Sequence, residues 1–317
     1  MNGRQKNSCM KYVLALLFLT LTSAALQAQD FIPLWPEGKK PNTNGKKITD
    51  SLFNERIWRV NTPGIYYLPA AKSDNKGTSI LICPGGGYER LSYVYNGFTF
   101  ARWFNMLGIN VFILIHRLPH QVDLADRQLA PLQDAQRAMR IIRSRAIAWN
   151  IKTDKIGVMG ISAGGHVAST LATHAMDVSA IKDALDTVSY RPDFMVLLSP
   201  VITMGKFAHP GSKKNFIGAD STQQKIENYS SELQVTNYTP PTFIVHALND
   251  STVNVKNSLL FYDALLDKKI KSSSLHIFPQ GGHGIRLDDN PGSTDLWLPL
   301  LELWLKETGF AVPIPFK

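Results

Sequence analysis

The stretch Lys155-Ile-Gly-Val-Met-Gly-Ile-Ser-Ala-Gly-Gly-His166 decides how the whole chain is interpreted. Its first half is a short apolar run typical of a buried strand, and its second half is typical of a helix start. Between them lies Gly160-Ile-Ser-Ala-Gly164, a G-x-S-x-G motif, which carries meaning only in this strand-to-helix context. The turn is so tight that the second residue on either side of the serine must be small. The sequence therefore predicts a nucleophile elbow with Ser162 at its tip.

The 317 residues have an ordinary globular composition, with 44% hydrophobic and 19% charged residues. A chain of this length can form one large α/β domain with a buried core. No internal repeat, low-complexity tract or linker rich in Pro, Gly or Ser divides the sequence. We therefore expect residues 29–317 to form a single domain.

The first 28 residues differ from the rest of the chain. A basic lead, Arg4–Lys11, precedes the apolar run Tyr12–Leu19, and small residues then lead up to Ala28. This order is typical of a secretory signal peptide, and the apolar run is too short for a comfortable membrane span. We expect residues 1–28 to be removed and the mature protein to be exported, periplasmic or secreted, without a stable membrane anchor.

Removal of that segment takes away three positive charges and no negative ones, so the formal net charge falls from +9 to +6. The remaining basic residues are scattered, which favours a solvated basic surface over nucleic-acid binding. Of the two cysteines, Cys9 lies in the predicted signal, which leaves Cys83 without an intrachain partner. No His, Cys and Asp cluster has the spacing of a closed metal site, so we expect no metal.

Segments typical of strands and helices alternate to the end of the chain. Continuous apolar strands separated by helices predict a mostly parallel sheet covered on both faces. Besides the elbow strand and its helix, the sequence predicts strands at 64–68, 79–83, 110–115, 194–198, 242–246 and 275–278, and helices at 98–107, 130–149, 258–269 and 294–308.

Three segments carry further expectations. The helix at 130–149 has one apolar stripe, with arginines on its other face. Residues 30–63 are expected to wrap the sheet edge. The polar stretch 206–234 is expected to lie near the rim of the active site.

A serine nucleophile needs a base to take its proton and an acid group to orient that base. In a sheet of this kind, such groups lie on loops just past the carboxyl ends of strands. Strand 242–246 runs into Asp250, and strand 275–278 runs into His283, which glycines flank on both sides. The order Ser162, Asp250, His283 is the one used by folds with this elbow. We assign these three residues as the candidate triad.

Alternatives to this assignment exist within the chain. His166 lies one turn beyond Ser162 but points along the helix, so we interpret it as structural. Asp250 has a second interpretation as an Asx turn or helix cap. Asp288 and Asp289 lie beyond the histidine and are a weaker alternative for the acid.

An oxyanion that forms on the substrate needs preorganised donors. The backbone N–H of Ala163 is one, because the elbow places it at the positive end of a helix. The second is expected from Pro84-Gly-Gly-Gly-Tyr88, directly after strand 79–83, at Gly86 or Gly87. A flexible glycine turn with no such role is the alternative interpretation.

Aromatic residues follow the glycines closely: Tyr88, Tyr93, Tyr95 and Trp103. They can stack on sugar rings or pack in the core, and the sequence favours neither. Tyr88, adjacent to the glycines, is the candidate substrate-binding residue.

Together these motifs resemble the α/β-hydrolase superfamily over about residues 30–310. The matching features are the strand with its three glycines, the elbow at Gly160–His166, the pair Asn249-Asp250 and the Gly281–Gly284 loop. More narrowly, the chain is similar to acetyl esterases related to hormone-sensitive lipase and to the exported acetylxylan and feruloyl esterases of polysaccharide-degrading bacteria. It departs from the lipases, which carry His before their glycines where this chain has Cys83-Pro84.

The resemblance implies a serine esterase that removes short acyl groups, mainly acetyl, from plant-type polysaccharides or oligosaccharides. It implies an acylated carbohydrate as the partner and no metal or organic cofactor. A feruloyl esterase and a general short-chain carboxylesterase would share every catalytic residue and stay open. A non-catalytic carbohydrate-binding relative is the alternative from a different functional class.

Overall fold

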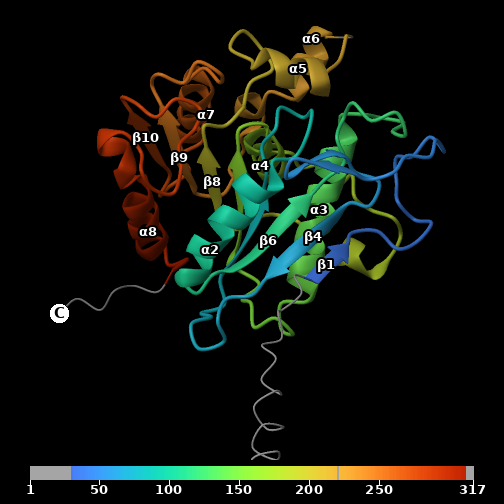
Figure 1. The fold of residues 1–317 in the computed structure, drawn as a ribbon, viewed down its shortest axis with the longest axis horizontal. Coiled ribbons are helices and arrows are strands. Elements are labelled where there is room, and N and C mark those ends of the chain that lie inside the picture. Colours follow the sequence, from blue (N-terminus) through green and yellow to red (C-terminus); the bar gives the residue numbers. More distant parts are fainter. Residues whose placement is uncertain (1–29, 220, 312–317) are drawn as a thin grey trace, which may run out of the picture. The chain divides into compact units, whose positions relative to one another are not determined.

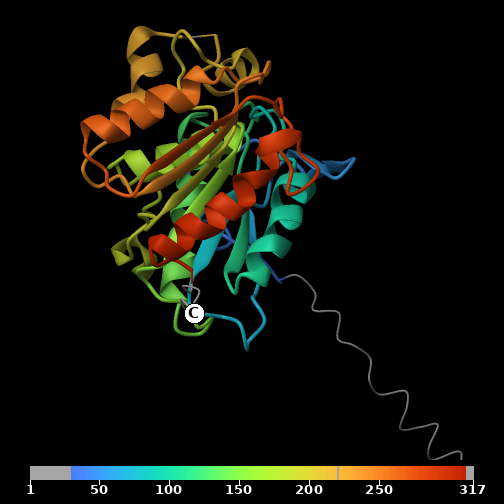
Figure 2. The ribbon, with the colours of Figure 1, turned by 90° about the vertical axis from the view of Figure 1, so that its left-hand side faces the viewer.

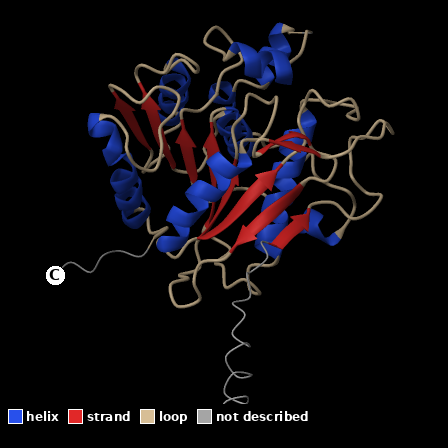
Figure 3. Ribbon diagram, in the orientation of Figure 1, coloured by secondary structure: helices blue, strands red, loops and turns tan. Residues whose placement is uncertain are grey.

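A computed structural model describes residues 30–219 and 221–311, so the predicted signal at 1–28 lies outside the described residues. From Phe31 onward the described residues form one compact unit. It is built on a central twisted sheet flanked by helices (Figures 1 and 3). Within the described part of the chain, no helix is long and apolar enough to cross a membrane.

Eight of the described strands form the main sheet, in the order β1-β4-β6-β5-β7-β8-β9-β10. They are β1 (Asp30–Pro33), β4 (Gly64–Leu68), β5 (Ser79–Cys83), β6 (Asn110–Ile115), β7 (Ile156–Ile161), β8 (Met195–Leu198), β9 (Thr242–Ala247) and β10 (Ser274–Phe278). The strand β4 is antiparallel to β6, and all the strands from β6 to β10 in this order are parallel. The predicted α/β fold with a mostly parallel sheet is confirmed.

Helices cover both faces of this sheet. The described helices and helical turns are the π-helical turn η1 (Val94–Phe98), α2 (Thr99–Met106), α3 (Leu129–Ser144), α4 (Ala163–Thr173), η2 (Ala184–Thr187), α5 (Pro210–Phe216), α6 (Gln223–Asn228), η3 (Ser231–Gln234), α7 (Lys256–Asp267), η4 (Gly292–Leu296) and α8 (Trp297–Glu307). Viewed along the sheet, α7 lies on one side and α8 with α2 on the other (Figure 2). The helices α3 and α4 share the core of α7.

The sheet separates two apolar cores, and successive side chains of one strand enter them in turn. Leu81 of β5 packs in the core that also holds Phe261 of α7. Its neighbours Ile80 and Ile82 pack in the other core, with Trp297 of α8. A strand with apolar side chains on both faces appears in the sequence as a continuous apolar run, which explains why β5 could be predicted.

The longest helix differs from its prediction in length. It ends at Ser144 and does not reach Trp149. Beyond its end the backbone N–H of Ala146 donates to the carbonyl of Arg143, and the chain turns toward β7.

The arginine face of α3 is also covered. Arg137 donates to both carboxylate oxygens of Asp183, at 2.9 and 2.6 Å, and Arg140 does the same with Asp177, at 3.1 and 2.6 Å. Residues 175–193 therefore fold over this face and pair its charges.

The two remaining segments lie at the sheet margins. Residues 30–63 contribute β1, which extends the main sheet beside β4, and a separate hairpin of β2 (Ser51–Phe53) and β3 (Arg56–Arg59). Residues 206–234 carry α5, α6 and η3, and α5 and α6 lie beyond the carboxyl ends of the strands (Figure 1).

A buried ion pair joins the end of β6 to α3. The guanidinium of Arg117 lies 2.8 Å from a carboxylate oxygen of Asp134, and both side chains have zero exposure. The indole N–H of Trp35 donates to the same carboxylate at 2.8 Å. The pair thus connects three distant parts of the chain.

Asp134→Asn should lower the free energy of unfolding by about 3–5 kcal/mol, because it leaves the Arg117 charge buried and unpaired. Urea denaturation measures the loss. Asp289→Asn is the control, since Asp289 forms an exposed pair with Arg286 at 3.9 Å and pairs of that kind contribute little. Equal midpoints for the two variants would contradict the prediction.

Candidate active site

Ser162 occupies the turn between β7 and α4 in a rarely populated backbone conformation, with φ of 56° and ψ of −124°. Contacts to the neighbouring strand hold it there. The N–H of Ser162 donates to the carbonyl of Leu198 at 3.1 Å, and its carbonyl accepts from the N–H of Val201 at 2.9 Å. A strained backbone of this kind persists only where its surroundings fix it, and such positions cluster at functional sites.

The glycines of the elbow are required by space. A Cβ on Gly160 would lie 2.3 Å from the carbonyl oxygen of Gly164, and one on Gly164 would lie 2.0 Å from the carbonyl oxygen of Cys83. Both distances are far inside van der Waals contact. The close approach of α4 to β5 is therefore possible only with glycine.

The three predicted triad residues lie within hydrogen-bond distance of one another. His283 Nε2 is 2.9 Å from Ser162 Oγ, and His283 Nδ1 is 2.8 Å from Asp250 Oδ2. They come from the loops after β7, β9 and β10, which share one edge of the sheet.

The environment of Asp250 keeps its carboxylate ionised. Burial alone raises the pKa of Asp250, but hydrogen bonds from His246 and His283 and from the N–H of Val253 outweigh it, so the pKa is held well below its usual range. An ionised Asp250 accepts the proton of His283 Nδ1. The lone pair of Nε2 is then directed at the hydroxyl of Ser162, as a general base requires.

Two residues near the acid have roles that sequence reasoning missed. His246, buried in β9, donates from Nε2 to Asp250 Oδ2 at 3.2 Å and to the carbonyl of Val253 at 3.0 Å. Asn249 accepts the N–H of Gly282 at 2.9 Å and so anchors the loop that carries the histidine. His246 sits within an apolar strand, and no motif marked it.

The alternative acids lie elsewhere. Asp289 pairs with Arg286, and its side chain is exposed. Asp288 is also exposed and lines a second cleft, whose lining does not include His283. The carboxylate that the structure brings to His283 is that of Asp250.

The glycine loop and the elbow present free backbone donors beside Ser162. The N–H of Gly85 donates to Asn96 Oδ1 at 3.2 Å, so it is occupied. Within the described residues, the N–H groups of Gly86, Gly87 and Ala163 make no hydrogen bond. Gly86 and Gly87 have φ of 136° and 65°, which glycine adopts readily. These three N–H groups are therefore available to a ligand.

The prediction that Tyr88 binds substrate is wrong. Its side chain is only 2% exposed, and its ring stacks on Phe216 with centroids 4.8 Å apart. Its hydroxyl donates to His166 Nδ1 at 2.7 Å, because His166 Nε2 must donate to the carbonyl of Tyr229 at 2.6 Å. Tyr88 thus links the glycine loop to α4 through His166 and to α5 through Phe216. No sugar ring can reach it.

A cavity of about 380 Å³ lies over Ser162 and His283. Polar groups from several loops and from α5 line it, among them Glu89, Arg90, Thr252 and, in α5, Asn215.

His209 lines this cavity too, and sequence analysis missed it. Its Nδ1 accepts the N–H of Ser212 at 3.2 Å and caps α5. In the neutral ring the proton is therefore on Nε2, which has no partner within the described residues. Burial, and then the nearby His283, lower the pKa of His209 and favour this neutral form. The ring offers an N–H donor to a ligand.

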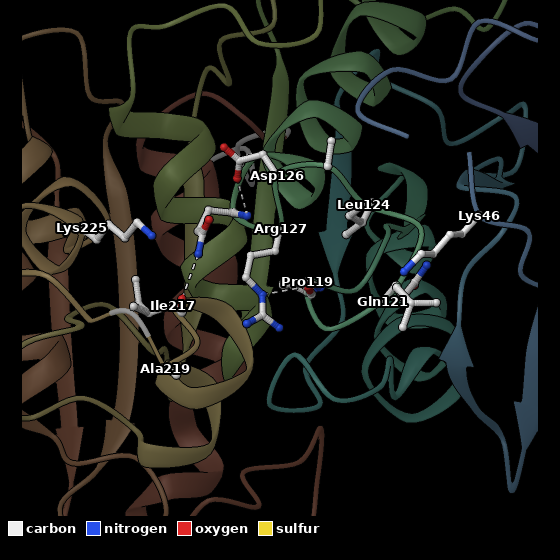
Figure 4. Close-up of a pocket in the computed structure, with 12 residues that line it drawn as sticks. Lys46, Pro119, Gln121, Leu124, Asp126, Arg127, Ile217, Ala219 and Lys225 are labelled. Carbon is white, nitrogen blue, oxygen red and sulfur yellow. Dashed lines mark hydrogen bonds between the residues drawn. The ribbon is translucent and has the colours of Figure 1, made fainter. Parts of the chain in front are cut away.

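A larger cavity, of about 600 Å³, lies between residues 119–128 and Ile217 (Figure 4). Basic side chains line it: Lys46, Arg127 and Lys225. None of the described residues that line it is a serine, cysteine or histidine, so it holds no counterpart of the Ser162–His283 pair. Among all described residues, no group of three or more His, Cys, Asp or Glu side chains is placed to hold a metal ion.

Comparison with known proteins gives matches to one family. The chain matches the BD-FAE family over residues 65–265, a range that includes Ser162 and Asp250. It is 34% identical to the acetylxylan esterase of Xylanibacter ruminicola over 275 residues, which are 85% of this chain and 52% of that protein. It is 36% identical to endo-1,4-beta-xylanase B of Butyrivibrio fibrisolvens over 244 residues, 74% of this chain and 38% of that protein. The chain spans about half or less of the length of these relatives.

Solved structures agree with this result. The acetyl ester-xyloside bifunctional hydrolase of Caldicellulosiruptor lactoaceticus has a TM-score of 0.77 and 35% sequence identity, covering 91% of this chain and 99% of that one. A carboxylesterase of Lactobacillus plantarum, with a TM-score of 0.65 and 23% identity, covers 85% of this chain and 100% of that one and shares the fold.

The buried His166 predicts a loss of stability in acid. Burial lowers the pKa of His166 to about 4, whereas the unfolded chain has an ordinary pKa near 6.5. Between these pH values only the unfolded state takes up the proton, so the contribution is complete above about pH 6.5 and is lost as the pH falls toward 4. The loss is roughly 3 kcal/mol.

His166→Gln removes the titrating group and keeps an amide that can contact the same partners. Between pH 7 and pH 4 it should lose about 3 kcal/mol less unfolding free energy than the wild type, measured by urea denaturation at each pH. An equal fall in unfolding free energy between pH 7 and pH 4 for the two proteins would contradict the interpretation of His166 as a buried neutral imidazole.

Proposed function

The chain belongs to the BD-FAE family of α/β hydrolases, and from this premise we propose that it is a serine esterase that removes acetyl groups from xylan-type polysaccharides or oligosaccharides. The observation that carries the proposal is the relay Ser162–His283–Asp250, which joins a nucleophile, a base and an orienting acid. The choice of acetyl and xylan rests on relatives named as an acetylxylan esterase and an acetyl ester-xyloside hydrolase.

In the first half of the reaction, Ser162 Oγ attacks the carbonyl carbon of the ester while His283 Nε2 takes its proton. The carbonyl electron pair moves onto oxygen, and the N–H of Ala163 with that of Gly86 or Gly87 stabilises the oxyanion. When the tetrahedral intermediate collapses, the C–O bond to the sugar breaks. The sugar oxygen leaves with the proton from His283, and the acetyl group stays on Ser162.

In the second half, water attacks the acetyl-serine ester and gives its proton to His283 Nε2. A second tetrahedral intermediate forms, and its collapse breaks the bond to Ser162 Oγ, which regains its proton from His283. Asp250 stays ionised throughout, holds the imidazole in the productive tautomer and stabilises its charged form.

Two of the rival functions differ from this one in the acyl group that is removed, and the third has no catalytic activity. A feruloyl esterase or a general short-chain carboxylesterase would use the same relay. A non-catalytic carbohydrate-binding relative needs none of it, so the intact relay favours an enzyme. The polar lining of the cavity over Ser162, which includes Glu89, Arg90 and Asn215, favours a short acyl group beside a sugar.

Export of the mature chain, with loss of residues 1–28, is part of this proposal. It rests on the sequence pattern alone, as do the limits of the mature domain at 29–317. An exported esterase would meet its acylated carbohydrate outside the cytoplasm.

Ser162→Ala should lower kcat on p-nitrophenyl acetate by about 10⁴-fold or more, because it removes the nucleophile. Asp250→Asn should lower it by about 10³–10⁴-fold, because the imidazole then takes the wrong tautomer. Stopped-flow or steady-state kinetics on the folded variants measure both effects, with Asp289→Asn as the control. Greater damage from Asp288→Asn than from Asp250→Asn would show that the acid is misassigned.

Preference for acyl chains should fall steeply beyond propionyl. Each methylene that a pocket accepts adds only about 1 kcal/mol, and the cavity over Ser162, where the acyl group must lie, is lined mainly by polar residues such as Glu89, Arg90 and Asn215. We expect kcat/KM on p-nitrophenyl octanoate to be at least about tenfold below that on the acetate. Equal or better rates on octanoate would favour a lipase-like enzyme instead.

A further inference from the structure

We propose that the esterase site continues into an aromatic cleft that binds sugar residues of the substrate beyond the acylated one. The inference rests on the proposed function. The cleft has a volume of about 460 Å³ and lies between α2 and the loop that follows His283. Its accessible lining residues include Tyr95, Trp103, Met106 and Arg286, and Phe100 lies buried beneath them.

The cleft adjoins the cavity over Ser162. Tyr95 lines both of them. Arg286, on the far wall of the cleft, belongs to the same loop as His283. An oligosaccharide with its acylated sugar at Ser162 therefore has this cleft as the neighbouring space.

The lining suits a sugar ring. A pyranose presents an apolar face of C–H bonds and a rim of hydroxyls, and it packs face-on against aromatic side chains. Tyr95 is 49% exposed and Met106 is 76% exposed, and exposed apolar residues that gather beside a site mark a binding surface. Arg102, Arg286 and Asp288 supply polar groups at the same cleft. Its volume lies within the roughly 300–1,000 Å³ of ligand pockets.

An unusual backbone turn presents Tyr95 to both spaces. Residues 94–98 form a π-helical turn, in which the N–H of Thr99 donates to the carbonyl of Val94. Such a turn holds one residue more than a regular helical turn. Because successive side chains of a regular helix are about 100° apart, the extra residue changes the direction in which the neighbouring side chains point. In this turn Asn96 is buried and accepts the N–H of Gly85, while Tyr95 is exposed. The turn thus fixes the glycine loop and turns Tyr95 outward.

The occupant that fits is a polymer chain and not an aromatic acyl group. Thr99, Arg102 and Met106 are exposed along the cleft, so it is open to solvent along its length. An open cleft lets a chain pass and continue on either side. A feruloyl group would gain most from an enclosed pocket that buries both faces of its ring.

The test compares kcat/KM on long and short acetylated xylo-oligosaccharides. In the wild type the long substrate should be favoured about tenfold, the effect of one good aromatic contact. Tyr95→Ala should reduce this ratio to about one, and Tyr95→Phe should keep it. Tyr238→Ala is the matched control, because Tyr238 is an exposed tyrosine outside the cleft. It should keep the wild-type ratio.

A binding measurement separates recognition from turnover. In a Ser162→Ala background, calorimetry should detect unacetylated xylo-oligosaccharide, and adding Tyr95→Ala should weaken its binding about tenfold. An unchanged length ratio and unchanged binding in the Tyr95→Ala proteins would overturn the inference. A rise in KM for methyl ferulate with the length ratio intact would also overturn it, because the cleft would then hold the acyl group. If the wild type cleaves p-nitrophenyl acetate but no acetylated xylo-oligosaccharide, the proposed function fails instead.

Discussion

The site depends on one steric constraint, the close contact between the start of α4 and the end of β5. Gly164 leaves no space for a Cβ beside the carbonyl of Cys83, so the helix can approach the strand directly before the glycine loop. Ser162, with its positive φ, lies directly before this helix start. Ser162, the N–H of Ala163 and the N–H groups of the glycine loop are therefore positioned together. Any side chain at position 164 would move Ser162 and Ala163 away from the N–H groups of the glycine loop.

Much of this arrangement could be predicted from the sequence because it depends on local patterns and on one topological rule. Continuous apolar runs marked the buried parallel strands. Since the carboxyl ends of parallel strands meet at one edge, residues directly after separate strands had to converge there. Ser162, Asp250 and His283 each follow such a strand, and the structure brings them within hydrogen-bond distance. The rule needs only the position of each residue relative to its strand.

What could not be predicted depends on partners far away in the chain. Tyr88 follows three glycines, and the sequence cannot tell a substrate-binding ring from a core ring there; Phe216 and His166 enclose it. His209 reaches the active-site cavity because the segment after β8 crosses the sheet edge, and no motif marks it. In the sequence His246 is an ordinary strand residue, and only the fold shows its hydrogen bond to the carboxylate of Asp250. Burial and pairing of this kind are set by tertiary contacts that no local pattern encodes.

An acetyl group by itself gives an enzyme little to recognise. It carries one methyl group, and a methylene is worth only about 0.8 kcal/mol when buried. Selectivity for an acetylated polymer must therefore come from the alcohol side of the ester, through contacts remote from the reacting carbon. Tyr95 is suited to that role because the turn that exposes it also holds Gly85 through Asn96. In the proposed enzyme, binding of the chain and placement of the oxyanion donors thus depend on the same short turn, η1.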